Sequence, residues 1–246
     1  MMKNFKITIE YDGTCYHGWQ RQKNEQTIQQ EIEKAVLTMT GKKISLTASG
    51  RTDAGVHALG QVANFHCDSE LSPQDFQNGI NSLTKDDIVI ISCDRVDENF
   101  HARFDAKSKT YHYQILNRTL PAAINRQYAW HIKKKLDLDA MRLALSHIIG
   151  THDFKAFEGT GSPRPHTNRC IFKADILEHD NGLIVIQIEA DGFLRFMVRN
   201  IVGTVADVGL GKITSNVFKK ILLAKDRSMA GATAPAKGLF LMQVKY

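Results

Sequence analysis

The sequence has no long hydrophobic run, and this absence argues against two classes of protein. No stretch of about 18 consecutive apolar residues is present, so a membrane-spanning protein is not expected. The first residues contain no apolar segment of the kind that directs secretion. We therefore expect a cytoplasmic protein that makes no contact with a membrane.

Cysteine is scarce, and histidine is not arranged in the way that metal ligands usually are. The sequence has four cysteines, which lie far apart along the chain: Cys15, Cys67, Cys93 and Cys170. They form no C-x-x-C motif, so reduced thiols are expected rather than a disulfide framework. Ten histidines are present, but there is no H-E-x-x-H motif and no close His/Cys cluster. The sequence therefore predicts no metal site.

The composition is that of a globular protein with a moderate excess of positive charge. The chain has 246 residues, of which 43% are hydrophobic, enough for one large domain or two small ones with a sizeable core. Its formal net charge of +6 makes a polyanionic partner plausible. Basic residues gather in three loop-like stretches, at 118–126, 133–135 and 164–169. Solvated surface charge and a nucleic-acid surface are both open interpretations of these stretches.

The first part of the chain predicts the order strand, helix, strand, strand, helix, strand. Alternating apolar residues indicate strands, at 6–11, 43–48, 60–66 and 88–92. A T-x-x-Q capping box starting at Thr27 predicts the beginning of the first helix, and Gly41 predicts its end. Ser72 followed by Pro73 is a typical start for the second helix.

A similar order is predicted for the second part. Strands are expected at 110–116, 171–179, 183–190 and 239–244, and helices after Asp137, from 197 onward and over 217–224. The sequence Asp180-Asn181-Gly182 indicates a tight hairpin. We therefore predict an α+β fold of two ferredoxin-like (β-α-β-β-α-β) halves, 1–105 and 106–246, related by pseudo-symmetry. Each half should have a mainly antiparallel sheet with helices on one side.

One polar loop lies between two of the predicted strands, and its centre is Asp53. Gly50 and Gly55 flank this carboxylate, so the backbone can take a positive φ on both sides and present the side chain. A plain hairpin turn with a solvated aspartate is the alternative. The nine residues from Gly50 to Ala58 read G-R-T-D-A-G-V-H-A, a run much more specific than a short motif.

This run resembles the active-site motif of the tRNA pseudouridine synthase A family, and further blocks resemble that family in the same order. They are Y-D-G-T-x-Y-x-G-W-Q (11–20), F-H-A-R-F (100–104), K-T-Y-H-Y (109–113), G-F-L-x-x-M-V-R-N-I-V-G (192–203) and A-P-A-x-G-L (234–239). The resemblance implies a cofactor-free isomerase that converts uridine to pseudouridine in the anticodon stem-loop, at tRNA positions 38 to 40. It also implies a homodimer whose cleft receives one tRNA.

The resemblance implies that Asp53 is the catalytic residue. A carboxylate can attack the sugar or the base, stabilise an oxocarbenium-like centre, or take a proton from the ribose, and the sequence does not choose among these. Asp53 must be ionised near neutral pH, which favours a nearby cation. By resemblance this cation is Arg199, and Arg195, one turn earlier on the same predicted helix, is the second candidate.

Three further side chains are implied as substrate-binding groups. Tyr111 corresponds to the tyrosine that stacks on the target uracil, although an ordinary sheet aromatic is the alternative. Arg51 corresponds to the arginine that occupies the space left by the flipped nucleotide, with an ion pair inside the loop as the alternative. Arg103 is a candidate RNA or active-site contact. The irregular stretch 158–168 is expected to be a surface loop that contacts substrate.

Two rival functions belong to other classes. A non-catalytic RNA-binding protein could be built on two ferredoxin-like units, because a fold does not determine an activity. A metal-assisted hydrolase could use Asp53 with nearby histidines, although the usual ligand spacing is absent.

Overall fold

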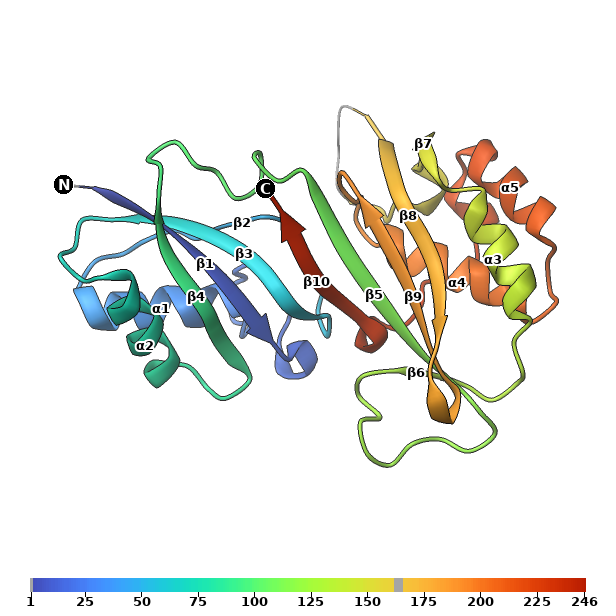
Figure 1. Ribbon diagram of the computed structural model, residues 1–246, viewed down its shortest axis with the longest axis horizontal. Helices are drawn as coiled ribbons and strands as arrows, with labels where there is room; N and C mark the ends of the chain where they lie inside the picture. Colours follow the sequence, from blue (N-terminus) through green and yellow to red (C-terminus); the bar gives the residue numbers. More distant parts are fainter. Residues whose placement is uncertain (1, 162–165) are drawn as a thin grey trace. The chain divides into compact units, whose positions relative to one another are not determined.

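The computed structural model describes residues 2–161 and 166–246, and the chain divides into two compact units (Figure 1). The first unit consists of Met1–Lys107 with Phe240–Tyr246, and the second of Ser108–Leu239. All four cysteines are free. Within the described residues, no helix is long and apolar enough to cross a membrane.

The first unit has the predicted order of strands and helices. Its elements are β1 (Lys3–Tyr11), α1 (Ile28–Thr40), β2 (Thr47–Ala48), β3 (His57–Cys67), α2 (Pro73–Leu83), β4 (Ile88–Val96) and most of β10 (Leu239–Lys245). The strands lie in the order β4-β1-β3, and both β2 and β10 pair with β3. All these pairings are antiparallel except that of β10 with β3.

The core of the first unit lies on one face of its sheet. Successive residues of a strand point to opposite faces, and in β1 Phe5 and Ile7 are buried while Lys6 is half-exposed. The ring of Phe76, from α2, lies 4.7 Å from the ring of Phe5 and 5.3 Å from that of Phe65. The aromatic cluster therefore fixes α2 against β1 and β3.

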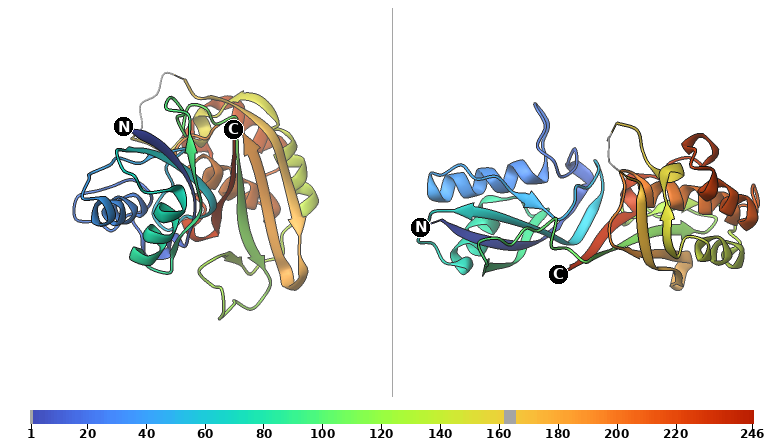
Figure 2. Two further views of the ribbon diagram at one scale, coloured as in Figure 1. Left: turned by 60° about the vertical axis from the view of Figure 1, so that its left-hand side comes forward. Right: turned by 90° about the horizontal axis from the view of Figure 1, so that it is seen from above.

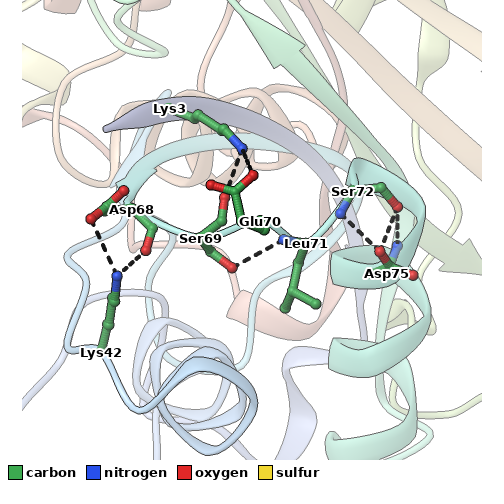
Figure 3. A network of polar contacts seen from close by, with 8 residues as sticks. All are labelled: Lys3, Lys42, Asp68, Ser69, Glu70, Leu71, Ser72 and Asp75. Carbon is green, nitrogen blue, oxygen red and sulfur yellow. Dashed lines mark hydrogen bonds and ion pairs between the residues drawn. The ribbon is translucent and has the colours of Figure 1, made fainter. Parts of the chain in front are cut away.

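The start of α2 confirms the prediction made from Ser72 and Pro73 (Figure 3). The hydroxyl oxygen of Ser72 accepts the backbone N–H of Asp75, and the Asp75 carboxylate accepts the backbone N–H of Ser72 at 2.8 Å. An ion pair between Lys3 and Glu70, at 3.1 Å, holds the connection between β3 and α2 in place. Local sequence chemistry was sufficient here because every partner lies within three residues of the cap.

The capping box predicted at the start of α1 is wrong. Thr27 is the N-cap residue, but its buried hydroxyl has no hydrogen-bond partner among the described residues. The end of the helix follows the prediction, because Gly41 adopts the left-handed conformation with φ of 68°. The position of α1 is therefore right although its predicted cap does not form.

The second predicted strand, 43–48, is reduced to Thr47–Ala48. The backbone N–H of Leu46 donates to Oε1 of Glu33 at 3.0 Å, and its carbonyl accepts from Nε2 of Gln29 at 3.4 Å. Both side chains come from the buried face of α1. The helix thus satisfies backbone groups that the predicted strand would have given to β3.

The second unit has a four-stranded antiparallel sheet with three helices. Its elements are β5 (Ser108–Asn117), β6 (Trp130–Ile132), α3 (Leu138–Ser146), β7 (Gly150–Asp153), β8 (Asn168–Glu178), β9 (Leu183–Ala190), α4 (Met197–Gly209) and α5 (Ser215–Ala224). The strand order is β5-β9-β8-β7, and β6 pairs with β5 in parallel. The short strands β6 and β7 were not predicted.

The hairpin between β8 and β9 forms as predicted, because Asn181 and Gly182 both have positive φ, 60° and 77°. Helices α3, α4 and α5 pack against one another, and α4 is buried almost all round (Figures 1 and 2). The predicted α+β class with a mainly antiparallel sheet is confirmed. The pseudo-symmetry of two halves stays a prediction.

Candidate active site

The loop that carries Asp53 is held by the segment that follows β1. The backbone N–H of Trp19 donates to the carbonyl of Thr52 at 3.0 Å, and the N–H of Gly55 donates to the carbonyl of Tyr16 at 3.3 Å. The carbonyl of Asp53 itself accepts the N–H of Val56 at 3.2 Å, which closes the turn. Main-chain contacts thus fix the loop on both sides of the half-buried aspartate.

Two glycines outside the loop make this close contact possible. A Cβ atom on Gly13 would lie 2.0 Å from the carbonyl oxygen of Val56. A Cβ atom on Gly18, where φ is +88°, would lie 2.6 Å from the carbonyl oxygen of Thr52. Any side chain at either position would displace the aspartate loop. The Y-D-G-T-x-Y-x-G-W-Q block therefore serves as the support of the G-R-T-D-A-G block.

Of the two glycines inside the loop, only one has the predicted conformation. Gly55 has a φ of 75°, but Gly50 is not among the residues with positive φ. The carbonyl of Gly50 accepts Nε2 of Gln61 at 2.9 Å, and Oε1 of the same side chain accepts the hydroxyl of Ser49 at 2.7 Å. A buried glutamine from β3, rather than backbone strain, thus fixes the first half of the loop.

Buried polar groups also lie beneath the second half of the loop. The hydroxyls of Tyr11 and Thr52 are 2.7 Å apart, and burial raises the pKa of Tyr11 to about 12, so this phenol stays protonated. Nδ1 of His57 accepts the backbone N–H of Gly13 at 3.1 Å and lies 3.0 Å from the carboxylate of Asp12. His57 is 2% exposed and stacks on Phe240. These contacts join the loop to β1, β3 and β10.

The other two predicted residues of the first unit are exposed. Arg51 lies two positions before Asp53 in the same loop. Arg103 follows β4, and its guanidinium lies 5.5 Å from the ring centre of Phe104, itself 73% exposed. Both arginines are therefore accessible to a large ligand.

In the second unit, Tyr111 lies on β5 with its ring packed edge-to-face on Phe193, at 5.0 Å between centres. Tyr113, two residues later, points to the same face of the strand. Its hydroxyl donates to the carbonyl of Pro235 at 2.7 Å, and burial raises the pKa of Tyr113, so it remains a donor. The sheet face that carries Tyr111 is thus rigidly packed.

Arg199 lies in the first turn of α4, half-buried. Its Nε donates to the carbonyl of Ala234 at 2.8 Å, and its guanidinium lies 5.1 Å from the ring centre of Phe196. Arg195 does not share the helix face as predicted, because α4 begins at Met197 and Arg195 is an exposed residue before it. The side chain of Arg195 also lies over Phe196, at 4.7 Å, and donates to the carbonyl of Thr160.

Phe196 is a structural residue of this region that the sequence did not reveal. It precedes α4 in the left-handed conformation, with a φ of 60°, which is unusual for a bulky residue. A Cβ atom on Gly159 would lie 2.3 Å from its ring. The glycine therefore leaves the space into which the ring of Phe196 turns, beneath the arginines. No motif rule predicts this conformation.

The remaining predictions have different outcomes. The pairing of Asp53 with Arg199 or Arg195 concerns residues of different units and stays a prediction. Residues 162–165 of the predicted contact loop 158–168 lie outside the described residues. Among the residues that are described, no group of three or more His, Cys, Asp or Glu side chains could hold a metal ion.

Comparison with known proteins places the chain in a family. A family model described as tRNA pseudouridine synthase matches residues 7–105 and 144–246. The chain is 46% identical to tRNA pseudouridine synthase A of Thermoanaerobacter sp. (strain X514), over 245 residues and 100% of both chains. It is 47% identical to tRNA pseudouridine synthase A of Clostridium acetobutylicum, also over 245 residues and 100% of both chains.

A solved structure is similar at a much lower level. A chain in the archaeal box H/ACA sRNP Nop10-Cbf5 complex is 11% identical, with a TM-score of 0.35, over 82% of this chain and 43% of that one. This likeness is too low to bear on the fold or the activity. The family model and the full-length relatives are sufficient on their own: the chain belongs to the tRNA pseudouridine synthase family and is an isomerase that acts on tRNA.

Proposed function

We propose that this enzyme isomerises uridine to pseudouridine in the anticodon stem-loop of tRNA, with Asp53 as its catalytic carboxylate. The observation that carries the proposal is the support of the Asp53 loop. Backbone hydrogen bonds from Trp19 and Gly55, and the close approach of Gly13 and Gly18, hold in place the backbone that bears the carboxylate. Such preorganisation is what a group acting on a reacting bond requires.

The reaction rearranges one nucleoside and needs no outside atoms. The bond between ribose C1′ and N1 of uracil breaks, the base turns, and C1′ bonds to C5 instead. The proton lost from C5 is balanced by one gained at N1. Asp53 can act on the sugar, the base or a ribose proton, and each route requires its ionised form.

Arg199 supplies the charge that keeps Asp53 ionised in this proposal. A guanidinium stays protonated at any physiological pH and favours the charged form of a nearby carboxylate. Its Nε donates to the carbonyl of Ala234, and the ring of Phe196 lies against its guanidinium. The side chain is thus oriented by the protein before substrate binds.

The target uridine must leave its base stack before the carboxylate can reach it, which costs about a few kcal/mol. We assign Tyr111 to stacking on the extruded uracil, and Arg51 to the gap that the uracil leaves. Arg103 is assigned to the RNA backbone. Modification at tRNA positions 38 to 40 is part of this proposal and is supported by the family resemblance.

The same resemblance supports a homodimer that binds one tRNA across both subunits. A cytoplasmic location is a further part of this proposal. So are two ferredoxin-like halves, 1–105 and 106–246, related by pseudo-symmetry, for which the predicted order of strands and helices is the support. Equilibrium sedimentation of the purified protein tests whether it is a homodimer, and a monomer at micromolar concentration is the contradicting result.

The activity itself is tested by incubating the protein with an unmodified tRNA transcript and mapping pseudouridine with a carbodiimide probe. We expect modification confined to the anticodon stem-loop. Binding of the transcript without any modified uridine would favour the non-catalytic RNA-binding alternative. Loss of turnover on exhaustive chelation, restored by a metal ion, would favour the metal-assisted alternative.

A further inference from the structure

A cluster of polar side chains joins the first turn of α4 to the segment that precedes β10. Asn200 is at its centre and is 0% exposed. Its Oδ1 accepts the hydroxyl of Thr233 at 2.6 Å and Nη2 of Arg227 at 3.1 Å, and its Nδ2 donates to the carbonyl of Phe157 at 2.8 Å. Arg227 Nη2 also donates to Thr233 Oγ1 at 3.1 Å. The three side chains therefore form a closed triangle inside the second unit.

This triangle and two contacts with α4 together hold the backbone of residues 230–234. Nη1 of Arg227 donates to the carbonyl of Ala230 at 3.2 Å, and the N–H of Gly231 donates to the hydroxyl of Thr204 at 3.0 Å. At Gly203, a Cβ atom would lie 1.8 Å from the carbonyl oxygen of Ala232, so the segment touches α4 directly. These contacts thus hold an irregular segment against α4.

The fixed segment in turn holds Arg199. The N–H of Ala234 donates to the carbonyl of Arg199 at 3.1 Å, and the carbonyl of Ala234 accepts Nε of Arg199 at 2.8 Å. The next carbonyl, of Pro235, accepts the hydroxyl of Tyr113 from β5. The side chain of Arg199 and β5, the strand of Tyr111, therefore both bind to the same two residues, Ala234 and Pro235.

We infer that Asn200, Arg227 and Thr233 are positioning residues for uridine isomerisation, which act by fixing the Ala234 carbonyl that orients the Arg199 guanidinium. This inference rests on the proposed role of Arg199. A long arginine side chain has many rotamers, and a fixed acceptor at Nε selects those that direct the guanidinium one way. If the Ala234 carbonyl moves, the Arg199 guanidinium populates several orientations, and a smaller fraction of enzyme molecules has it in the reactive one.

The first test compares conservative changes at Thr233. Thr233→Val removes the hydroxyl at nearly constant volume, and we expect kcat to fall about tenfold, the effect of one hydrogen bond, with KM for tRNA within about twofold. Thr233→Ser restores the hydroxyl and should restore kcat. Thr84→Val is the matched control, because Thr84 is also half-buried and its hydroxyl donates to the carbonyl of Ile80 at 3.0 Å, at the end of α2. This control should keep the wild-type kcat.

The decisive test is whether the triangle acts through Arg199. In the Arg199→Met protein the guanidinium is gone and the unbranched stem remains, so adding Thr233→Val should cost no further activity in single-turnover assays. Arg227→Lys offers a second route to the same comparison if Thr233→Val does not fold. It keeps the charge and loses the forked geometry.

The outcomes separate the inference from the proposed function. Losses that multiply in the double variant would show that the triangle acts independently of Arg199, and would overturn the inference while leaving the proposed function intact. A fall in kcat that Thr233→Ser does not rescue would also overturn it. Wild-type turnover by Arg199→Met alone would instead refute the proposed role of Arg199.

Discussion

The Asp53 loop and the start of α4 are both rigid, but different kinds of contact hold them. Around Asp53 the contacts are mainly between main-chain groups, and Gly13 and Gly18 allow them by having no side chain. Arg199 donates to the carbonyl of Ala234, and the segment that carries this carbonyl is held by side chains, above all Asn200 and Arg227. The comparison teaches that the carboxylate is placed by the path of the backbone, whereas the cation is placed by a polar network.

This difference predicts how each region responds to substitution. Where a main-chain contact leaves no room for a methyl group, almost no substitution is tolerated, because any added side chain would force the whole loop to move. A side-chain network can keep part of its geometry when one member is replaced by a similar group. Changes near Asp53 should therefore act as an all-or-none loss, and conservative changes near Arg199 as graded ones.

The largest expected effect is that of Asp53→Asn. The amide has nearly the same shape but neither the charge nor the basicity, so product formation should fall by about a thousandfold or more. Affinity for tRNA should stay within a few-fold, as measured by filter binding. The matched control is Asp139→Asn, which removes a carboxylate from the surface of α3. Turnover by Asp53→Asn comparable to that of the control would refute the assignment.

The support of the loop is tested by Gly18→Ala. The new methyl group would press on the carbonyl of Thr52, so we expect a loss of about 2–4 kcal/mol in the free energy of unfolding and of most of the activity. Gly41→Ala is the control, because Gly41 also has a positive φ but no atom within 4 Å of the added group. Its expected cost is about 1 kcal/mol, with kcat unchanged. Equal effects in urea unfolding and turnover would contradict the close-contact explanation.

The role of Tyr111 is tested by comparing Tyr111→Phe with Tyr111→Leu. The phenyl ring keeps both its contact with Phe193 and a surface for stacking, so activity should remain within a few-fold of wild type. Leucine has no aromatic face and should cost about 1–3 kcal/mol in kcat/KM. Similar losses in the two variants would argue against stacking.

The smallest effect concerns the exposed cations. Binding of tRNA should weaken steeply as salt rises, because phosphate contacts release counterions. Arg103→Gln, which removes the exposed cation assigned to the RNA backbone, should reduce the slope of log affinity against log salt by about one. Arg142→Gln is the control, since Arg142 is already paired with Asp139 and Glu178. A flat salt response of the wild-type protein would contradict a phosphate-binding surface.

The parts of the fold that follow from the sequence are those set by near neighbours. The cap at Ser72, the helix end at Gly41 and the turn at Asn181 each depend on a few adjacent residues, and each was predicted. The strand expected at 43–48 failed because Glu33 and Gln29, on a helix earlier in the chain, take its hydrogen bonds. Local sequence patterns give no information about hydrogen bonds between a predicted strand and side chains of an earlier helix.

The candidate site divides in the same way. Its motifs predict Asp53, Arg51, Tyr111 and Arg199 as site residues, because the resemblance is to blocks of sequence. They do not reveal Arg227 and Thr233, which meet Asn200 across 27 and 33 residues. These contacts depend on how a helix packs against an irregular segment. Neither the hydrophobic periodicity of the sequence nor the spacing of its motifs predicts this packing.

The central claim is that Asp53, kept negative by Arg199, rearranges a uridine that stacks on Tyr111. The most direct measurement is a crystal structure of the protein bound to an anticodon stem-loop that contains 5-fluorouridine at the target position. We predict that the base is extruded onto Tyr111, with the carboxylate of Asp53 in contact with it or its ribose and paired with Arg199. An Asp53 carboxylate remote from both the fluorinated nucleoside and every basic side chain would contradict the claim.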